Sequence, residues 1–387
     1  MEVSYNVLVG DVRTQLAEIA DKTVQCVITS PPYWGLRDYG NDGQIGLEQT
    51  PDEFISELVF VFREVWRVLS DEGTLWLNIG DSYSSHKDCK STAQTLAMGG
   101  ASEAATVIDK GKSVSRNSKV LKSVGLKNKE LVGIPWMLAF ALRADGWYLR
   151  QEIIWAKPNP MPESVKDRCT KSHEQIFLLT KSSRYFFDGD AIAEPAQNWG
   201  TRDRSEMRNS TEDPLLKHHG LEGKEDEENP TRNKRSVWTV PTRPFKAAHF
   251  ATFPPELIRP MILAGTSEFG KCDQCGNQFV RVIETGTIAE RQTRDSTIGV
   301  IPGRDSVTRL NSVNMETLPK KHVGWEPSCE CVEAKAVPCL VLDPFAGAGT
   351  TLFVANEEGR NAVGVELNDE YVKIIHARMN KLPQKLF

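Results

Sequence analysis

Long apolar runs and an export signal are both missing from this chain. No apolar stretch approaches the ~20 residues that a helix needs to cross a bilayer. The N-terminal segment has no basic region followed by an apolar core, so we expect no secretory signal. A protein without either feature is expected in the cytoplasm, which is a reducing compartment. The eight cysteines are then thiols or metal ligands rather than disulfides.

An excess of positive charge is missing too. The 47 lysines and arginines are outnumbered by 52 aspartates and glutamates, which gives a net charge of −5. DNA-binding proteins often have a basic balance, but a local basic face can act inside an acidic whole. Residues 84–130 offer such a face. They are rich in lysine, serine, alanine and glycine without a clear period, which predicts a long mobile loop.

Phosphate-binding motifs are also missing, since there is neither a full G-x-G-x-x-G nor a Walker lysine. The sequence also has no internal repeats. The chain does show apolar strand patterns alternating with amphipathic helix patterns. This alternation predicts an α/β protein with a mostly parallel sheet covered on both faces. The predicted strands cover residues 7–9, 24–29, 74–79 (after a turn at 71–73), 148–155, 174–180, 337–342 and 361–366, and the predicted helices cover 12–19, 51–69, 131–144, 254–264, 350–358 and 369–381.

Two segments near opposite ends of the chain look like strands that end in reactive loops. One is Thr29-Ser30-Pro31-Pro32-Tyr33, and the other is Asp343-Pro344-Phe345-Ala346-Gly347-Ala348-Gly349-Thr350-Thr351. In the second segment the two glycines permit close approach of a ligand, and the N-terminus of the following helix favours an anion. Glu366 lies 23 residues after Asp343, where dinucleotide folds place an acid that accepts hydrogen bonds from ribose hydroxyls.

Together the two segments resemble the catalytic and S-adenosylmethionine-binding motifs of the amino-methylating DNA methyltransferases, in the permuted order with the catalytic motif first. The resemblance implies a Rossmann-like, class I methyltransferase fold. Gly10-Asp11 resembles the motif whose acid contacts the amino group of the cofactor's adenine. Phe253-Pro254 resembles the helix beside the methionine end, although plain core packing explains Phe253 nearly as well. The implied cofactor residues are Asp11, Phe253, Asp343, Pro344, Phe345, Gly347, Gly349, Thr350 and Glu366.

The Ser30-Pro31-Pro32-Tyr33 segment has the groups that activation of an exocyclic amino nitrogen requires. Such a nitrogen is a poor nucleophile because its lone pair is delocalised into the base. The Ser30 hydroxyl and the Pro31 carbonyl can accept its N–H hydrogens, and the prolines fix the direction of that carbonyl. Tyr33 offers a flat face on which a flipped base can stack. The alternative for this segment is an ordinary turn with a packed aromatic side chain.

Two further observations bear on which atom of which base is methylated. Serine before Pro-Pro goes mostly with N4-cytosine methylation and aspartate with N6-adenine methylation, so Ser30 favours cytosine, with adenine as the alternative. C5-cytosine methylation needs a cysteine nucleophile, typically after proline. Cys339 follows Pro338 but lies just before the cofactor strand, so we expect it to be buried. Residues 73–81, 143–158 and 173–181 resemble the motifs beside the catalytic loop and around the target base.

Four cysteines have the pattern of a structural metal site. Cys272 and Cys275 form a C-x-x-C-G knuckle, and Cys329 and Cys331 form a C-x-C pair. Four thiolates predict a closed, structural zinc site. The 53 residues between Cys275 and Cys329 exceed the common spacings, so two unrelated thiol pairs stay as the alternative. The surrounding insertion is rich in arginine, and we expect it to form a DNA-facing lobe.

The predicted function is site-specific transfer of a methyl group from S-adenosylmethionine to N4 of a flipped-out cytosine in DNA. A restriction endonuclease is a candidate partner, and no membrane is expected. A non-catalytic zinc-containing DNA-binding protein and an RNA or protein amino-methyltransferase stay open as alternatives. The expected segments are the catalytic half at 1–83, the basic loop at 84–130, core at 131–190, a charged insertion for target recognition at 191–236, a return to the core at 237–269, the cysteine lobe at 270–333 and the cofactor half at 334–387.

Overall fold

The computed structural model describes residues 3–36, 40, 43–84, 124–195, 231–243, 253–285 and 320–382. Most of the predicted basic loop and of the predicted charged insertion therefore lies outside the described residues, and so do residues 286–319 of the predicted cysteine lobe. The chain divides into two compact units. The first contains residues 1–192, 235–280 and 327–387, and the second contains residues 193–234 and 281–326.

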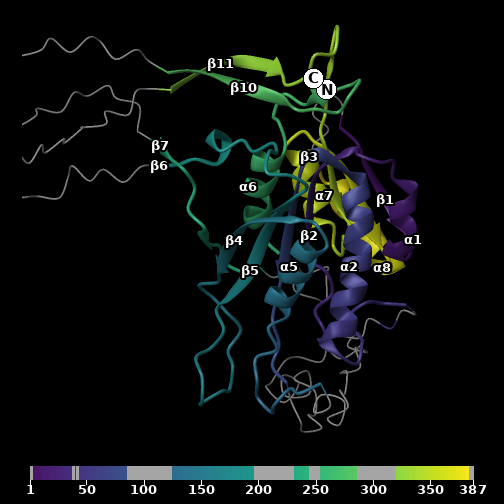
Figure 1. Cartoon of the computed structure of the whole chain (residues 1–387), viewed down its shortest axis with the longest axis vertical. Helices are drawn as coiled ribbons and strands as arrows, with labels where there is room; N and C mark the ends of the chain where they lie inside the picture. The colour runs from purple at the N-terminus through teal and green to yellow at the C-terminus, as the bar shows by residue number, and fades with distance from the viewer. Residues whose placement is uncertain are drawn as a thin grey trace, which may run out of the picture. The chain divides into compact units, whose positions relative to one another are not determined.

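An eight-stranded sheet forms the centre of the first unit. Figure 1 labels five of its strands, β1 to β5. Five neighbouring strands run parallel to one another. The sixth strand in the order pairs antiparallel with both of its neighbours, and the last two strands are parallel. The predicted mostly parallel, Rossmann-like sheet is thus confirmed. Its order is β1 (Tyr5–Val9), β14 (Asn361–Glu366), β13 (Leu340–Asp343), β2 (Val24–Thr29), β3 (Leu69–Ile79), β5 (His173–Thr180), β4 (Tyr148–Ala156) and β8 (Val237–Thr239).

Helices cover both faces of this sheet (Figure 1). Alternate strand residues point to opposite faces, so Val27 and Leu75 join one apolar cluster while Ile28 and Trp76 join the other. The first cluster is completed by α1 (Val12–Gln15), the 3₁₀ turn Leu16–Glu18, α2 (Pro51–Val68) and α5 (Ile134–Ala144). The second is completed by α6 (Pro255–Gly265), α7 (Thr350–Glu357) and α8 (Asp369–Met379).

Helix α2 shows how local sequence sets an element. Thr50 precedes it, and the Thr50 hydroxyl accepts a hydrogen bond from the Glu53 amide at 3.2 Å. The Glu53 carboxylate in turn accepts from the Thr50 amide at 3.1 Å, which completes a capping box. Apolar residues at helical spacing, among them Phe54, Leu58 and Val61, are fully buried. The helix follows its predicted range because all of these signals are local.

Three predicted elements differ from the structure. The turn expected at 71–73 lies inside β3, as a bulge where Leu69 pairs with Val24 and Thr74 pairs with Cys26. Gly73 suits this bulge because a Cβ there would lie 2.5 Å from the Leu69 side chain. The strand expected at 337–342 is divided into β12 (Ala336–Val337) and β13 at Pro338, which has no amide hydrogen to donate. The helix expected at 12–19 changes to a 3₁₀ turn after Gln15.

The remaining strands in the described residues form three small two-stranded sheets. In the first unit, β9 (Lys271–Cys272) pairs antiparallel with β12. Strands β10 (Phe279–Thr285) and β11 (Lys320–Pro327) pair with each other, as do β6 (Glu194–Pro195) and β7 (Thr231–Arg232). Within the second unit, the Arg281 guanidinium lies 4.5 Å from the centre of the Trp325 ring. Across the described ranges, every helix is too short or too polar to span a bilayer.

Candidate active site

The two loops singled out by the sequence meet at one edge of the sheet. Strands β2 and β13 are parallel neighbours, so their carboxyl ends lie together. There the Thr29 hydroxyl donates a buried hydrogen bond of 2.8 Å to Asp343 Oδ1, joining residues that are 314 positions apart. The chain leaves β2 toward β3 on one side and leaves β13 toward β14 on the other. This is the switch point at which open α/β sheets bind ligands.

Asp343 organises the second loop from inside the protein. Its side chain is fully buried. One carboxylate oxygen accepts from Thr29 and from the Phe345 amide at 3.1 Å, and the other accepts from the Thr351 hydroxyl at 2.7 Å. Burial raises the pKa of Asp343 to about 6, against the effect of these donors. Because protein groups bind both oxygens, this geometry favours a positioning role for Asp343 over direct contact with a cofactor.

The glycines and helix start after Asp343 form an open turn. Gly347 and Gly349 have φ angles of 51° and 72°, in the left-handed region that glycine adopts without strain. Within the described residues, a Cβ on Gly347 would meet only the Phe345 carbonyl oxygen, at 4.0 Å, so this part of the structure leaves the space beside it open. A residue that the sequence did not single out holds this turn. Arg378 of α8 donates to the Thr350 hydroxyl at 2.9 Å and to the Ala348 carbonyl at 3.3 Å.

Glu366 ends β14 beside this turn. Its carboxylate accepts from the Gly347 amide at 2.7 Å and from the Asn368 amide at 2.9 Å. Burial raises the pKa of Glu366 to about 7, which exceeds the opposing effect of these amides. The Gly10 amide donates to the Glu366 carbonyl at 2.9 Å, so the end of β1 reaches the same place. A half-buried carboxylate beside an open glycine turn is a suitable acceptor for ribose hydroxyls.

Asp11 and the remaining predicted cofactor residues lie in different settings. Asp11 caps α1 and binds Arg13, whose hydrogen bonds lower the pKa of the Asp11 carboxyl. Pro344 is buried and Phe345 packs partly against the cluster beneath α2. Phe253 packs partly against the α6 cluster. This packing agrees with the plain core interpretation of Phe253, and its contact with cofactor stays a prediction.

On the catalytic side, Tyr33 is held by its hydroxyl and by its ring. Ser30, Pro32 and Tyr33 are half-buried, and Pro31 is buried. The Tyr33 hydroxyl donates to Glu174 at 2.7 Å. The ring lies against Gly80, where a Cβ would come within 2.4 Å of it. Since any side chain at position 80 would displace this ring, glycine there fixes the plane in which Tyr33 lies.

Sequence comparison identified the segments that hold Tyr33, which are residues 73–81, 143–158 and 173–181, but it did not identify the side chains that contact it. Glu174, at the start of β5, also accepts from the Asn78 side-chain amide at 3.2 Å and forms an ion pair with Lys157. The Glu174 and Lys157 side chains are only 16% and 17% exposed, and the Lys157 ammonium lies 4.1 Å from the centre of the Trp155 ring. We call Tyr33, Asn78, Lys157 and Glu174 the tyrosine anchor. The register that pairs Trp155 with Glu174 creates it, and local sequence does not reveal that register.

The cysteines divide into two settings. Cys339 is 1% exposed, and burial raises the pKa of its thiol to about 11, so it is unsuited to be a nucleophile. This confirms the prediction that Cys339 is buried. Cys272, Cys275, Cys329 and Cys331 come together, with all four sulfurs within 4.8 Å of one another. The long spacing between the two pairs therefore does not keep them apart.

The fold and the switch-point site define a Rossmann-like α/β protein of the kind that includes the S-adenosylmethionine-dependent methyltransferases. Among solved structures, the PvuII DNA methyltransferase, described as cytosine-N4-specific, is similar with a TM-score of 0.51 and 14% identity. The match covers 100% of this chain and 91% of that one. At this identity the similarity supports the fold alone.

The chain belongs to the DNA methylase family that methylates N6 or N4 amino groups, whose family model matches residues 24–279 and 339–377. It is 40% identical to the Type II methyltransferase M.XycI of Xanthomonas campestris pv. cyanopsidis, covering 96% of this chain and 86% of the relative. It is 36% identical to M.SmaI of Serratia marcescens, covering 97% and 91%. The protein is thus a DNA amino-methyltransferase that depends on S-adenosylmethionine.

Proposed function

We propose that this enzyme methylates the N4 amino group of cytosine at a specific DNA site. The observation that carries the proposal is the hydrogen bond between Thr29 and Asp343, because it joins the Ser-Pro-Pro-Tyr loop to the glycine turn. A base held by the first loop and a cofactor held by the second would then be neighbours. Ser30 in place of aspartate is the feature that favours cytosine over adenine.

The residues around the glycine turn fit S-adenosylmethionine. Gly347 leaves open space, the N-terminus of α7 favours the carboxylate of the methionine part, and Glu366 offers an acceptor for ribose hydroxyls. Asp11 is the residue proposed for the adenine amino group. Bound cofactor supplies an electrophilic methyl group on a positively charged sulfur. Asp343 and Arg378 hold the turn in shape without needing to contact the cofactor.

The catalytic loop is proposed to hold and activate the base. Ser30 accepts one amino hydrogen through its hydroxyl, and Pro31 accepts the other through its carbonyl, which returns electron density to the nitrogen. Tyr33 stacks on the base, an interaction that is worth ~1–3 kcal/mol per base. The tyrosine anchor fixes the Tyr33 ring before DNA arrives, so this loop loses little freedom when the base enters.

The relatives' names also suggest a partner. M.XycI and M.SmaI are called Type II methyltransferases. We therefore propose that this enzyme protects DNA from a restriction endonuclease with the same recognition site. Its arginine-rich insertion at 270–333 and the charged insertion at 191–236 are the proposed DNA-recognition segments. Arg281 and Trp325, which contact each other, belong to the first of these segments.

Nucleoside analysis tests the proposal directly. The purified enzyme is incubated with S-adenosylmethionine and unmethylated DNA, and the DNA is digested and analysed by mass spectrometry. N4-methylcytosine is the expected product. N6-methyladenine would overturn the base assignment from Ser30 and keep the chemistry, whereas methylation that survives Ser30→Ala at the normal rate would overturn the catalytic assignment.

A further inference from the structure

Methyl transfer from a sulfonium requires no metal ion, so the cluster of four cysteines calls for a different explanation. Its sulfurs lie within 4.8 Å of one another, and the cysteines are free thiols rather than disulfides. Tetrahedral zinc with Zn–S bonds of ~2.3 Å places its sulfurs about 3.8 Å apart. The four sulfurs are therefore already near the separation that one ion requires. Thiols form only weak hydrogen bonds with one another, so four thiols gathered this closely gain far more from a shared cation.

We propose that Cys272, Cys275, Cys329 and Cys331 bind one structural Zn²⁺ ion. All four positions around the ion are protein sulfurs, so none is open for water or substrate. The knuckle is shaped for the task. The Gly276 amide donates to the Cys272 carbonyl at 3.0 Å, and Gly276 has a φ of 78°, which closes the turn between the first two sulfurs. The Gln274 amide donates to the Cys272 sulfur at 3.4 Å, a bond that stabilises a thiolate.

The knuckle is attached to the starts of the two strands that carry the active site. Gln25 of β2 is fully buried and donates to the Gly276 carbonyl at 3.3 Å. Its side-chain oxygen accepts from the Leu340 amide of β13 at 2.9 Å. Lys271 adds a hydrogen bond of 2.9 Å to the Thr23 carbonyl. The first half of the site is therefore part of the methyltransferase core, at the edge opposite the catalytic loops.

The second half of the site returns to the knuckle after β11. The Asp273 amide donates to the Lys335 carbonyl at 3.0 Å, and Gln274 donates to the Val332 carbonyl at 2.8 Å. The ion would join Cys275 to Cys329 across the 53 residues that contain β10 and β11. Zinc thus holds both ends of this insertion at the core, whatever the insertion binds. The inference is independent of which base is methylated.

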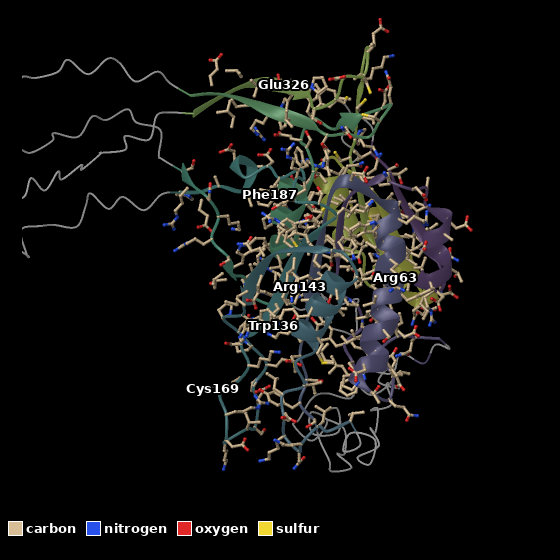
Figure 2. The ribbon with its side chains drawn as sticks, viewed as in Figure 1. Arg63, Trp136, Arg143, Cys169, Phe187 and Glu326 are labelled. Carbon is tan, nitrogen blue, oxygen red and sulfur yellow. The ribbon has the colours of Figure 1, made fainter. Side chains whose placement is uncertain are left out.

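Metal analysis of matched variants tests this site. Wild-type protein, purified without chelator, is compared with Cys272→Ser and Cys329→Ser by elemental mass spectrometry. Cys169→Ser is the control, since Cys169 is exposed on the loop between β4 and β5, outside the cluster (Figure 2). One zinc per chain is expected in the wild type and in Cys169→Ser, and a loss of zinc is expected in both cluster variants. Iron in place of zinc, or equal zinc in every variant, would overturn the proposal.

A second measurement covers the case in which the cluster variants fail to fold. Co²⁺ exchanged into the wild-type protein should show the visible bands of a tetrahedral thiolate site, and a mercurial that blocks thiols should release one zinc per chain. Folded wild-type protein that binds neither Zn²⁺ nor Co²⁺ would refute the site. Methyl transfer and S-adenosylmethionine binding are measured on the same samples. A zinc-loaded protein that methylates no DNA would refute the proposed function and leave the metal site standing.

Discussion

Replacing Tyr33 by phenylalanine removes one hydroxyl and leaves the stacking ring in place. The main bond lost is a 2.7 Å hydrogen bond to the Glu174 carboxylate, and a longer one of 3.4 Å to Asn78 Oδ1 is lost with it. Hydrogen bonds to charged groups contribute about 1.5–3 kcal/mol. Glu174 keeps its bonds to Asn78 and Lys157 after the change, so we expect the lower end, about 1.5 kcal/mol. If the anchor serves to present the ring to the base, kcat/KM for DNA falls ~10-fold.

The assay follows radiolabelled methyl transfer to DNA and measures cofactor affinity separately. The Kd for S-adenosylmethionine should be unchanged, because Tyr33 lies on the catalytic loop. Tyr148→Phe is the control, since Tyr148 is exposed at the opposite end of β4. The double variant Tyr33→Phe with Glu174→Gln should lose less than the sum of the two single losses. Wild-type transfer by Tyr33→Phe, together with loss of transfer in Tyr33→Ala, would show that the ring acts without its anchor and would refute this reasoning.

Three further predictions concern the remaining site residues. Ser30→Ala should reduce methyl transfer by about 100-fold or more, because it removes the proposed acceptor for an amino hydrogen, while the Kd for cofactor measured by calorimetry stays the same. Asp343→Ala should weaken cofactor binding by at least about tenfold, since Thr29, Thr351 and the Phe345 amide lose their shared partner; unchanged affinity would contradict the positioning role. The pKa of Glu366 is raised to about 7, so its charged form, the proposed acceptor for ribose hydroxyls, is lost as the pH falls below 7. Cofactor affinity should therefore decrease by up to about tenfold per pH unit below 7 and level off above it, whereas Glu366→Gln should show a flat profile.

The same pKa has a consequence for folding that runs in the opposite direction. Between the ordinary value of 4.5 and about 7, folded Glu366 keeps a proton that the unfolded chain has released. The contribution of this group to stability therefore falls as the pH rises through that window. Bound cofactor should reverse part of this loss by stabilising the carboxylate.

Local signals in the sequence predicted the elements well, and long-range pairing explains most of what they missed. The capping box at Thr50 and the apolar spacing of α2 act within a few residues. Residues 71–73 form a bulge inside β3 because β3 pairs with β2 on both sides of them. The tyrosine anchor depends in the same way on the register of β4 with β5. The sequence placed Asp343 in the cofactor loop, but its burial against two threonines emerges only when β2 and β13 are adjacent.

The hydrogen bond between Thr29 and Asp343 also limits how early in its synthesis this enzyme can become active. Ribosomes add ~5–20 residues per second, so about 15–60 s separate the synthesis of these two residues, which lie 314 positions apart. During that time the apolar strand β2 can pair with β3 but has an open edge where β13 will lie. A nascent chain therefore has its proposed catalytic loop long before it has the turn proposed to hold the cofactor. DNA modification by each molecule can begin only after Asp343 and the glycine turn that follows it have left the ribosome.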